Sequence, residues 1–315
     1  MTKKSLLEKT MVTRTRRLPE WFKMKLPMGY KYSRVKNLSH KYKLNTICSS
    51  GNCPNIGECW SNGTATFMIL GDICTRNCKF CGVKTGRPAP PDPGEPMRLA
   101  ESIRLLELDY CVVTSVDRDD LPDSGAGLWA ETIKTIKKVN PYTGIEVLIP
   151  DFKGDESLLK KITDAGPDVI AHNLETVRRL TPHIRSKASY EVSLRVIAGI
   201  TAAGKRTKSG IMLGLGETQE EVIETMDDLT GAGCEIMTIG QYLAPGKSHM
   251  PVVEYVKPEV FEELRRIGLE KGFRFVESSP LVRSSYHAEK HATGTEDRNK
   301  TKYVKNSKLS GSRVR

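Results

Sequence analysis

The sequence predicts an α/β protein with a partial (β/α)6 TIM-like barrel at its core and an extension at each end. Three observations predict this fold class. Six short apolar runs recur between residues 66 and 240, helical patterns alternate with them, and polar residues follow most of the runs. Strands that alternate with helices form a parallel sheet, and six such units over about 175 residues favour an incomplete barrel. A doubly wound sheet is the alternative arrangement.

The six apolar runs are the predicted strands, and they cover residues 66–71, 110–116, 145–149, 168–171, 209–214 and 235–240. The predicted helices place apolar residues at helical spacing and cover residues 98–107, 129–139, 157–165, 190–203 and 217–231. The last of these opens with acidic residues, which suit the positive end of a helix dipole. A further helix is expected at 257–271, after the barrel.

Polar segments follow the predicted strands at residues 114–118, 150–151, 172–175, 214–217 and 241–242, and a loop with three cysteines follows the first strand. The carboxyl ends of the strands in a β/α barrel form one face, and that face holds the active site. Any single segment is read equally well as a turn or a helix cap. The recurrence at successive strand ends indicates that these residues surround one mouth.

The net charge of +11 is concentrated at the two ends of the chain. Residues 1–45 hold 13 Lys and Arg against 2 acidic residues, and residues 288–315 hold 8 against 3, so the middle is mildly acidic. Basic ends can bind nucleic acid or steer an acidic protein partner, and they are equally typical of solvated chain ends.

Composition and motifs divide the chain into five segments. They are a basic N-terminal extension (1–45), a cysteine loop (46–65), the barrel core (66–245), a C-terminal helix with the segment after it (246–288), and a basic tail (289–315) whose composition predicts disorder. The chain contains no run of about 18 apolar residues, so no membrane span is expected. The N-terminus lacks the apolar core and cleavage site of a secretory signal, so a cytoplasmic protein is expected.

Six of the eight cysteines fall within 34 residues, in two groups of three. Such clustering in a cytoplasmic chain of this size indicates metal rather than disulfides. Cys74, Cys78 and Cys81 have the spacing C-x3-C-x2-C, so three thiolates on one tight loop can hold three corners of an iron–sulfur cubane. No fourth cysteine has matching spacing, which leaves one iron open to a small molecule.

The second triad is Cys48, Cys53 and Cys59, with the spacing C-x4-C-x5-C in a loop that contains glycine and proline. A structural zinc site is the alternative interpretation, and it normally has four protein ligands. With either metal, the fourth ligand must come from elsewhere in the chain.

The loop Cys74-Thr75-Arg76-Asn77-Cys78-Lys79-Phe80-Cys81 resembles the signature of the radical S-adenosylmethionine superfamily. The resemblance implies that its three cysteines bind a [4Fe–4S] cluster whose open iron takes the amino and carboxylate groups of S-adenosylmethionine. Reductive cleavage then yields a 5′-deoxyadenosyl radical, which abstracts hydrogen from an unactivated C–H bond. Such chemistry needs a dry, enclosed site.

Within this superfamily the chain resembles the lipoyl synthase family over residues 18–290. The motifs that carry the resemblance are Cys48-x4-Cys53-Pro54-Asn55-x-Gly57-Glu58-Cys59, residues 63–68 (GTATFM), 114–120 (TSVDRDD), 172–176 (HNLET), 207–210 (TKSG), 240–243 (GQYL) and 283–286 (RSSY). The resemblance implies a second, auxiliary [4Fe–4S] cluster on Cys48, Cys53 and Cys59, with Ser285 rather than Ser284 as its fourth ligand. A serine oxygen binds iron more weakly than a thiolate does, which suits a cluster that must open.

The implied activity is that of a sulfurtransferase in lipoate biosynthesis. The auxiliary cluster is consumed, and two sulfur atoms enter C6 and C8 of a protein-bound octanoyl-lysine chain. The implied partners are octanoylated lipoyl carrier domains (of a 2-oxoacid dehydrogenase or the glycine-cleavage carrier protein), an electron donor of the ferredoxin or flavodoxin type and a cluster-repair protein. Neither a membrane nor a nucleic acid is expected as a partner.

Seven residues are proposed to contact S-adenosylmethionine: Phe80 near the adenine, Thr114 and Ser115 at the amino group, Asn173 and Glu175 at the ribose or amino acid, and Arg195 and Lys208 at the carboxylate. The last two are read equally well as surface charges. Cys111 and Cys234 lie in predicted strands and are interpreted as buried apolar residues without a metal role.

Two other functions are weighed against this one. A radical methylthio- or sulfurtransferase that acts on tRNA would suit the basic ends, but no RNA-binding domain is visible. A nucleic-acid-binding protein stabilised by zinc or a cluster is the non-enzymatic alternative. The sequence does not identify the preferred carrier, the source of the replacement cluster or the oligomeric state.

Overall fold

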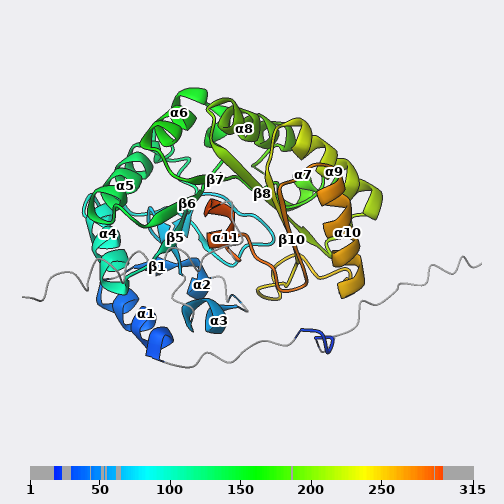
Figure 1. The fold of residues 1–315 in the computed structure, drawn as a ribbon, viewed down its shortest axis with the longest axis horizontal. Coiled ribbons are helices and arrows are strands. Elements are labelled where there is room, and N and C mark those ends of the chain that lie inside the picture. The colour runs from blue at the N-terminus through cyan, green and yellow to red at the C-terminus, as the bar shows by residue number, and fades with distance from the viewer. Residues whose placement is uncertain are drawn as a thin grey trace, which may run out of the picture.

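The computed structural model describes residues 18–22, 30–42, 44–50, 53, 55–61, 65–185, 187–286 and 288–293. One eight-stranded sheet, in the order β1-β2-β5-β6-β7-β8-β9-β10, curves around a central space and is covered on its outside by helices (Figure 1). Its strands are β1 (Asn45–Thr46), β2 (Thr66–Ile69), β5 (Tyr110–Ser115), β6 (Gly144–Leu148), β7 (Val169–Ala171), β8 (Arg206–Leu213), β9 (Ile236–Gln241) and β10 (Phe275–Ser278). A small second sheet pairs β3 (Ile73–Cys74) with β4 (Lys84–Thr85).

The outer helices are α4 (Glu95–Leu106), α5 (Ala126–Val139), α6 (Glu156–Ala165), α8 (Tyr190–Ala202), α9 (Gln219–Gly231) and α10 (Pro258–Glu270). Shorter elements are the 3-10 turn η1 (Phe152–Gly154) and helix α7 (Thr181–Ile184). The N-terminal part contributes α1 (Tyr30–Lys41), α2 (Ile47–Ser50) and α3 (Ile56–Ser61), and the chain ends, within its described residues, in α11 (Ala288–Thr293).

The predicted partial barrel is confirmed, because all six predicted strands are present and each pairs in parallel with the next along the chain. The strand order never reverses, so the doubly wound alternative is wrong: that fold needs a point at which the order changes direction. Strand β10 adds a seventh parallel strand, which the sequence analysis did not predict.

The boundary of α9 shows how local chemistry sets where a helix begins. The sequence predicts a start at Glu217, but the helix starts at Gln219 because Thr218 is its N-cap. Thr218 and Glu221 form a reciprocal capping box, while the Glu217 carboxylate accepts hydrogen bonds from the N–H groups of Gly214 and Leu215. Glu217 therefore belongs to the turn and not to the helix.

Side chains alternate between the two faces of the sheet. Ile145 and Val147 of β6 belong to the apolar layer that packs against α4 and α5, so Glu146 between them faces the interior of the barrel, called the lumen here. The Glu146 carboxylate lies 2.8 Å from Nζ of Lys208, and each residue is only 1% exposed. The hydroxyl of Tyr110 donates to the other oxygen of Glu146 at 3.2 Å.

The composition predicts a disordered tail that starts at residue 289, and this predicted boundary is too early in the chain. Residues 288–293 form α11, which lies in the middle of the barrel (Figure 1). Its six residues have no apolar periodicity that could have marked them as structured; burial inside the barrel orders them. Residues 1–17 and 294–315, which carry much of the basic charge, lie outside the described residues.

The buried pair predicts a large effect on stability. Lys208→Met should lower the free energy of unfolding by about 3–5 kcal/mol, because it leaves the Glu146 carboxylate buried without its cation. Lys160→Met is the matched control, since Lys160 pairs with Asp164 at 2.9 Å but is 73% exposed, and it should cost less than about 1 kcal/mol. Chemical denaturation measures both values, and equal losses would contradict the assignment.

Candidate active site

A cavity of about 440 Å³ lies at the carboxyl ends of the strands. This volume is in the usual range for a small-molecule site. Cysteines from both triads line it, although they come from opposite sides of β2 in the sequence. The lining includes Cys48, Cys53, Cys74, Cys78, Cys81, Phe80, Thr114, Ser115, Asn173, Glu175, Ser284 and Ser285.

The loop that carries Cys74, Cys78 and Cys81 begins at a sharp turn after β2. Leu70 and Gly71 both have positive φ, +68° and +96°, which redirects the chain toward the mouth. The backbone N–H groups of Arg76 and Asp117 each donate to Sγ of Cys74 at 3.4 Å. The pairing of β3 with β4 holds the start of the loop.

Arg76 ties this loop to the ends of β5 and β6. Its guanidinium makes two-pronged hydrogen bonds to Asp119, at 2.9 Å, and to Asp151, at 2.7 Å, and lies 3.4 Å from Asp117. The side chain is 6% exposed, so these bonds form largely out of water and are stronger for it. The Arg76 guanidinium outweighs the effect of burial and lowers the pKa of Asp151 to about 2.

The auxiliary triad comes from the N-terminal part of the chain. Cys48 lies on α2 and Cys59 on α3, with Cys53 between them. These cysteines, Ser285 and Tyr286 line a smaller hollow beside the main cavity. The Asn55 side chain donates to the carbonyl of Leu281 at 2.6 Å, so a direct bond joins the two distant segments.

The two neighbouring serines have different surroundings. The hydroxyl of Ser284 accepts a hydrogen bond from the Asn173 amide at 2.8 Å, and Ser284 does not line the hollow that holds the auxiliary triad. Ser285 lines that hollow together with all three cysteines. This arrangement supports the choice of Ser285 over Ser284 as the iron ligand.

Five of the seven proposed S-adenosylmethionine contacts line the main cavity: Phe80, Thr114, Ser115, Asn173 and Glu175. Asn173 donates from its side-chain amide to Glu175 at 3.0 Å and to Ser284 at 2.8 Å, and its Oδ1 is buried without a hydrogen-bond partner among the described residues. Glu175 has φ of +68°, a conformation that is costly for a non-glycine residue and is concentrated at functional sites. Burial raises the pKa of its carboxyl group.

The other two proposed contacts lie elsewhere, and they are corrected here. Lys208 is locked to Glu146 in the lumen, and Arg195 is exposed on α8. Neither lines the cavity, whereas Arg185 does. Arg185 is buried and donates from one nitrogen to the carbonyl of Leu174 at 3.0 Å and to the hydroxyl of Ser193 at 3.3 Å, and its other two guanidinium nitrogens make no hydrogen bond among the described residues.

Sequence reasoning gave no role to Arg76 or Arg185. Arg76 had a usable signal, because it lies inside the cysteine loop and the acidic residues at 117, 119 and 151 follow the next two strands. Arg185 had none, since it follows the short helix α7 rather than a strand. The polar segment at 214–217 forms the turn before α9, which agrees with the alternative interpretation of these segments as turns or helix caps.

The donor sets fit iron–sulfur clusters. Three thiols per site are available, and all eight cysteines are free. Burial raises the pKa of Cys78 to about 12 and that of Cys81 to about 11, so iron binding must displace protons from neutral thiols. No group of three Cys, His, Asp or Glu side chains among the described residues converges on a single metal ion, and a cubane does not need such a group because each of its thiolates binds a different iron. Cys111 is buried in β5, and Cys234 is buried in the turn that precedes β9.

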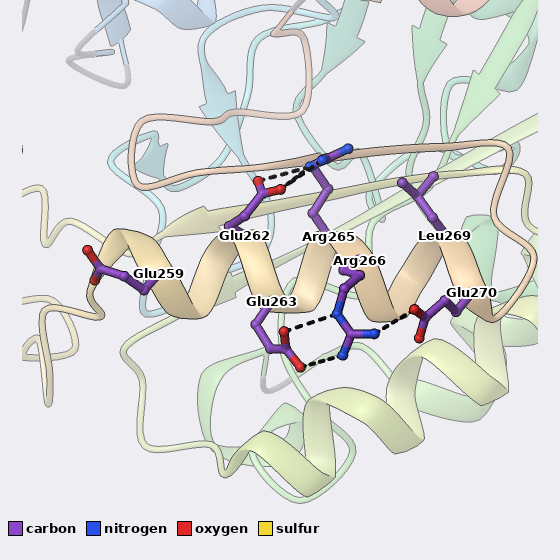
Figure 2. A pocket seen from close by; sticks show the side chains of 7 residues that line it. All are labelled: Glu259, Glu262, Glu263, Arg265, Arg266, Leu269 and Glu270. Atoms are coloured by element: carbon purple, nitrogen blue, oxygen red, sulfur yellow. Dashed lines mark hydrogen bonds and ion pairs between the residues drawn. The ribbon is translucent and has the colours of Figure 1, made fainter.

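A second hollow lies over α10, as Figure 2 shows. Its charged residues pair along the helix, Arg265 with Glu262 and Arg266 with both Glu263 and Glu270. Such pairs are typical of a solvated helix face, and the hollow has no group suited to catalysis. No helix in the described part of the chain is long and apolar enough to cross a membrane.

Two family models and several curated relatives match this chain. A model of the radical SAM superfamily matches residues 68–229, and a model of the N-terminal domain of lipoyl synthase matches residues 2–53. A lipoyl synthase of Bacteroides thetaiotaomicron is 60% identical over 275 residues, which cover 87% of this chain and 98% of the relative. The mitochondrial lipoyl synthase of Nematostella vectensis is 59% identical, with 87% and 94% covered.

Solved structures show the same fold at low sequence identity. Methylornithine synthase aligns with a TM-score of 0.52 and 14% identity, covering 90% of this chain and 94% of that one. The hydrogenase maturase HydG aligns with a TM-score of 0.54 and 12% identity, covering 84% and 74%. Because relatives at about 60% identity span most of its length and both family models match, the chain belongs to the lipoyl synthase family of the radical SAM superfamily.

Proposed function

We propose a division of labour among the residues of this sulfurtransferase, which inserts two sulfur atoms, at C6 and C8, into a protein-bound octanoyl chain. Cys74, Cys78 and Cys81 hold the cluster that binds S-adenosylmethionine. Cys48, Cys53 and Cys59, with Ser285, hold the auxiliary cluster. When bound, these groups supply the 5′-deoxyadenosyl radical and the inserted sulfur.

One observation carries this proposal: a single cavity receives cysteines of both triads and Ser285. A substrate carbon inside it can therefore face the radical source on one side and the sulfur source on the other. Positioning of this kind replaces a search in solution with a fixed geometry.

The described residues also provide a place for S-adenosylmethionine. Asn173 and Glu175 line the cavity side by side, and Glu175 offers carboxylate oxygens. Arg185 takes the carboxylate role that was first given to Arg195 and Lys208, because a guanidinium matches carboxylate geometry. Phe80, Thr114 and Ser115 complete the lining near the cysteine loop.

The rest of the cavity suits an alkyl chain. Apolar residues from six different segments line it, and they include Ile47, Met68, Val112, Leu148, Met212 and Leu243. An octanoyl chain has no polar group along its carbons, so burial in such a lining is favourable. The same lining excludes water from a reactive centre.

The chain acts on octanoylated lipoyl domains. We further propose that the electron donor is of the ferredoxin or flavodoxin type, that a repair protein restores the auxiliary cluster, and that the enzyme is cytoplasmic. The basic ends are proposed to steer an acidic carrier domain, since long-range attraction of this kind raises association rates at low salt.

Iron content tests the two-cluster assignment. The anaerobically reconstituted chain should hold about eight irons, and Cys48→Ala should hold about four while it still cleaves S-adenosylmethionine. The auxiliary triad is lost and the radical triad is untouched in that variant. Four irons in the parent chain, with no change in Cys48→Ala, would sink the assignment.

Arg76→Met tests the tether of the cysteine loop. Removal of the guanidinium leaves Asp119 and Asp151 without their cation, so the loop should loosen and iron should fall from about eight to about four per chain. Arg179→Met is the matched control, because Arg179 pairs with Glu221 on an exposed surface. The control should keep all its iron, and an Arg76→Met chain that also did so would refute the tether.

A further inference from the structure

The lumen is closed by α11 on the side away from the active site. Tyr110, Arg206 and Phe275 are the first residues of β5, β8 and β10. Ala288 packs against Tyr110 and Val112, the ring of His291 lies 5.4 Å from that of Phe275, and Arg206 donates to the carbonyl of His291. Because Tyr110, Arg206 and Phe275 begin their strands, α11 fills the lumen near the amino ends of the strands. Figure 1 shows this helix in the middle of the barrel.

Helix α11 has a polar sequence, yet two of its side chains are deeply buried. Ala288 and His291 are both fully buried. His291 lies 3.5 Å from a Glu277 oxygen, and Tyr110 continues the contact to the Glu146–Lys208 pair. Close packing of this kind resists small displacements, so the helix is held in one place.

Ser285 is joined directly to this helix. Its backbone carbonyl accepts a hydrogen bond from the N–H of Ala288, the first residue of α11, at 3.4 Å. On the other side, the carbonyl of Leu281 is bonded to Asn55 near the auxiliary triad. The short segment with Ser285 is thus held at both ends, by the triad's own loop and by the lumen.

We propose that α11 is an internal plug that positions Ser285 at the auxiliary triad, with Ala288 and His291 as positioning residues. The inference rests on the proposed role of Ser285 as an iron ligand. A ligand from a distant part of the chain needs such an anchor, because an untethered segment loses conformational entropy each time it binds. The anchor leaves the hydroxyl free to detach and return while its backbone stays in place.

The test uses chains that carry only the auxiliary site, with Cys74, Cys78 and Cys81 replaced by alanine. The parent, Ser285→Ala, a chain that ends at Tyr286 and a chain that ends at Thr293 are reconstituted with ⁵⁷Fe. Iron content and Mössbauer spectra are then compared. The chain that ends at Thr293 keeps α11 and should match the parent, whereas the chain that ends at Tyr286 keeps Ser285 but should match Ser285→Ala.

Ala288→Leu is the point variant that leaves the chain at full length. It overfills the contact with Tyr110 and should also shift the spectrum toward that of Ser285→Ala. With the radical-site cysteines restored, each variant should still cleave S-adenosylmethionine under dithionite, which shows that the barrel is folded. If the chain that ends at Tyr286 does not fold, Ala288→Leu decides.

A parental spectrum in both the chain that ends at Tyr286 and Ala288→Leu, with a changed one in Ser285→Ala, would overturn the plug but keep the ligand. A parental spectrum in Ser285→Ala would overturn the assignment of the ligand itself, and the plug's role with it.

Discussion

The active site depends on one guanidinium, that of Arg76. It lies inside the radical-site cysteine loop and binds carboxylates that follow β5 and β6. Without these bonds, the loop with its three metal ligands would be flexible after the end of β2. The buried, two-pronged bonds hold it against two neighbouring strand ends and so place the three thiols at the mouth of the barrel. The chemistry proposed for the cavity depends on this placement of the three thiols.

A second constraint acts on the auxiliary site, whose ligands come from both ends of the chain. The cysteines lie before the first barrel strand, and Ser285 lies after the last. The bond from Asn55 to Leu281 and the packing of α11 in the lumen bring these two segments together. The segments that flank the barrel in the sequence thereby form two walls of one cavity. Ser285 is the weakest of the proposed ligands, and contacts on both sides hold its segment in place. This arrangement suits an iron–oxygen bond that must break and reform.

The sequence predicted much of the fold because its signals are local. Strands β5 and β9 are built on short apolar runs, and α4 and α5 have clear helical spacing, so all were located within a few residues. The cysteine spacing located both triads. Predictions of site residues failed where a polar side chain can contribute either to the active site or to the interior of the barrel. Lys208 lies on a strand of the active barrel, but only the cross-strand distance to Glu146 shows that its charge is used internally. Helix α11 was missed because burial by distant strands, rather than its own pattern, makes it a helix.

We propose that one cavity delivers both the radical and the sulfur to the same carbon chain. The most direct test is mass analysis of an octanoyl-lysine peptide after anaerobic turnover by a chain whose clusters were reconstituted with ³⁴S-labelled sulfide. We predict that the product of the parent chain carries two heavy sulfur atoms. The product of Cys48→Ala should carry no sulfur, even though that variant cleaves S-adenosylmethionine. A sulfur-bearing product from Cys48→Ala, or a parental product without the heavy isotope, would contradict it.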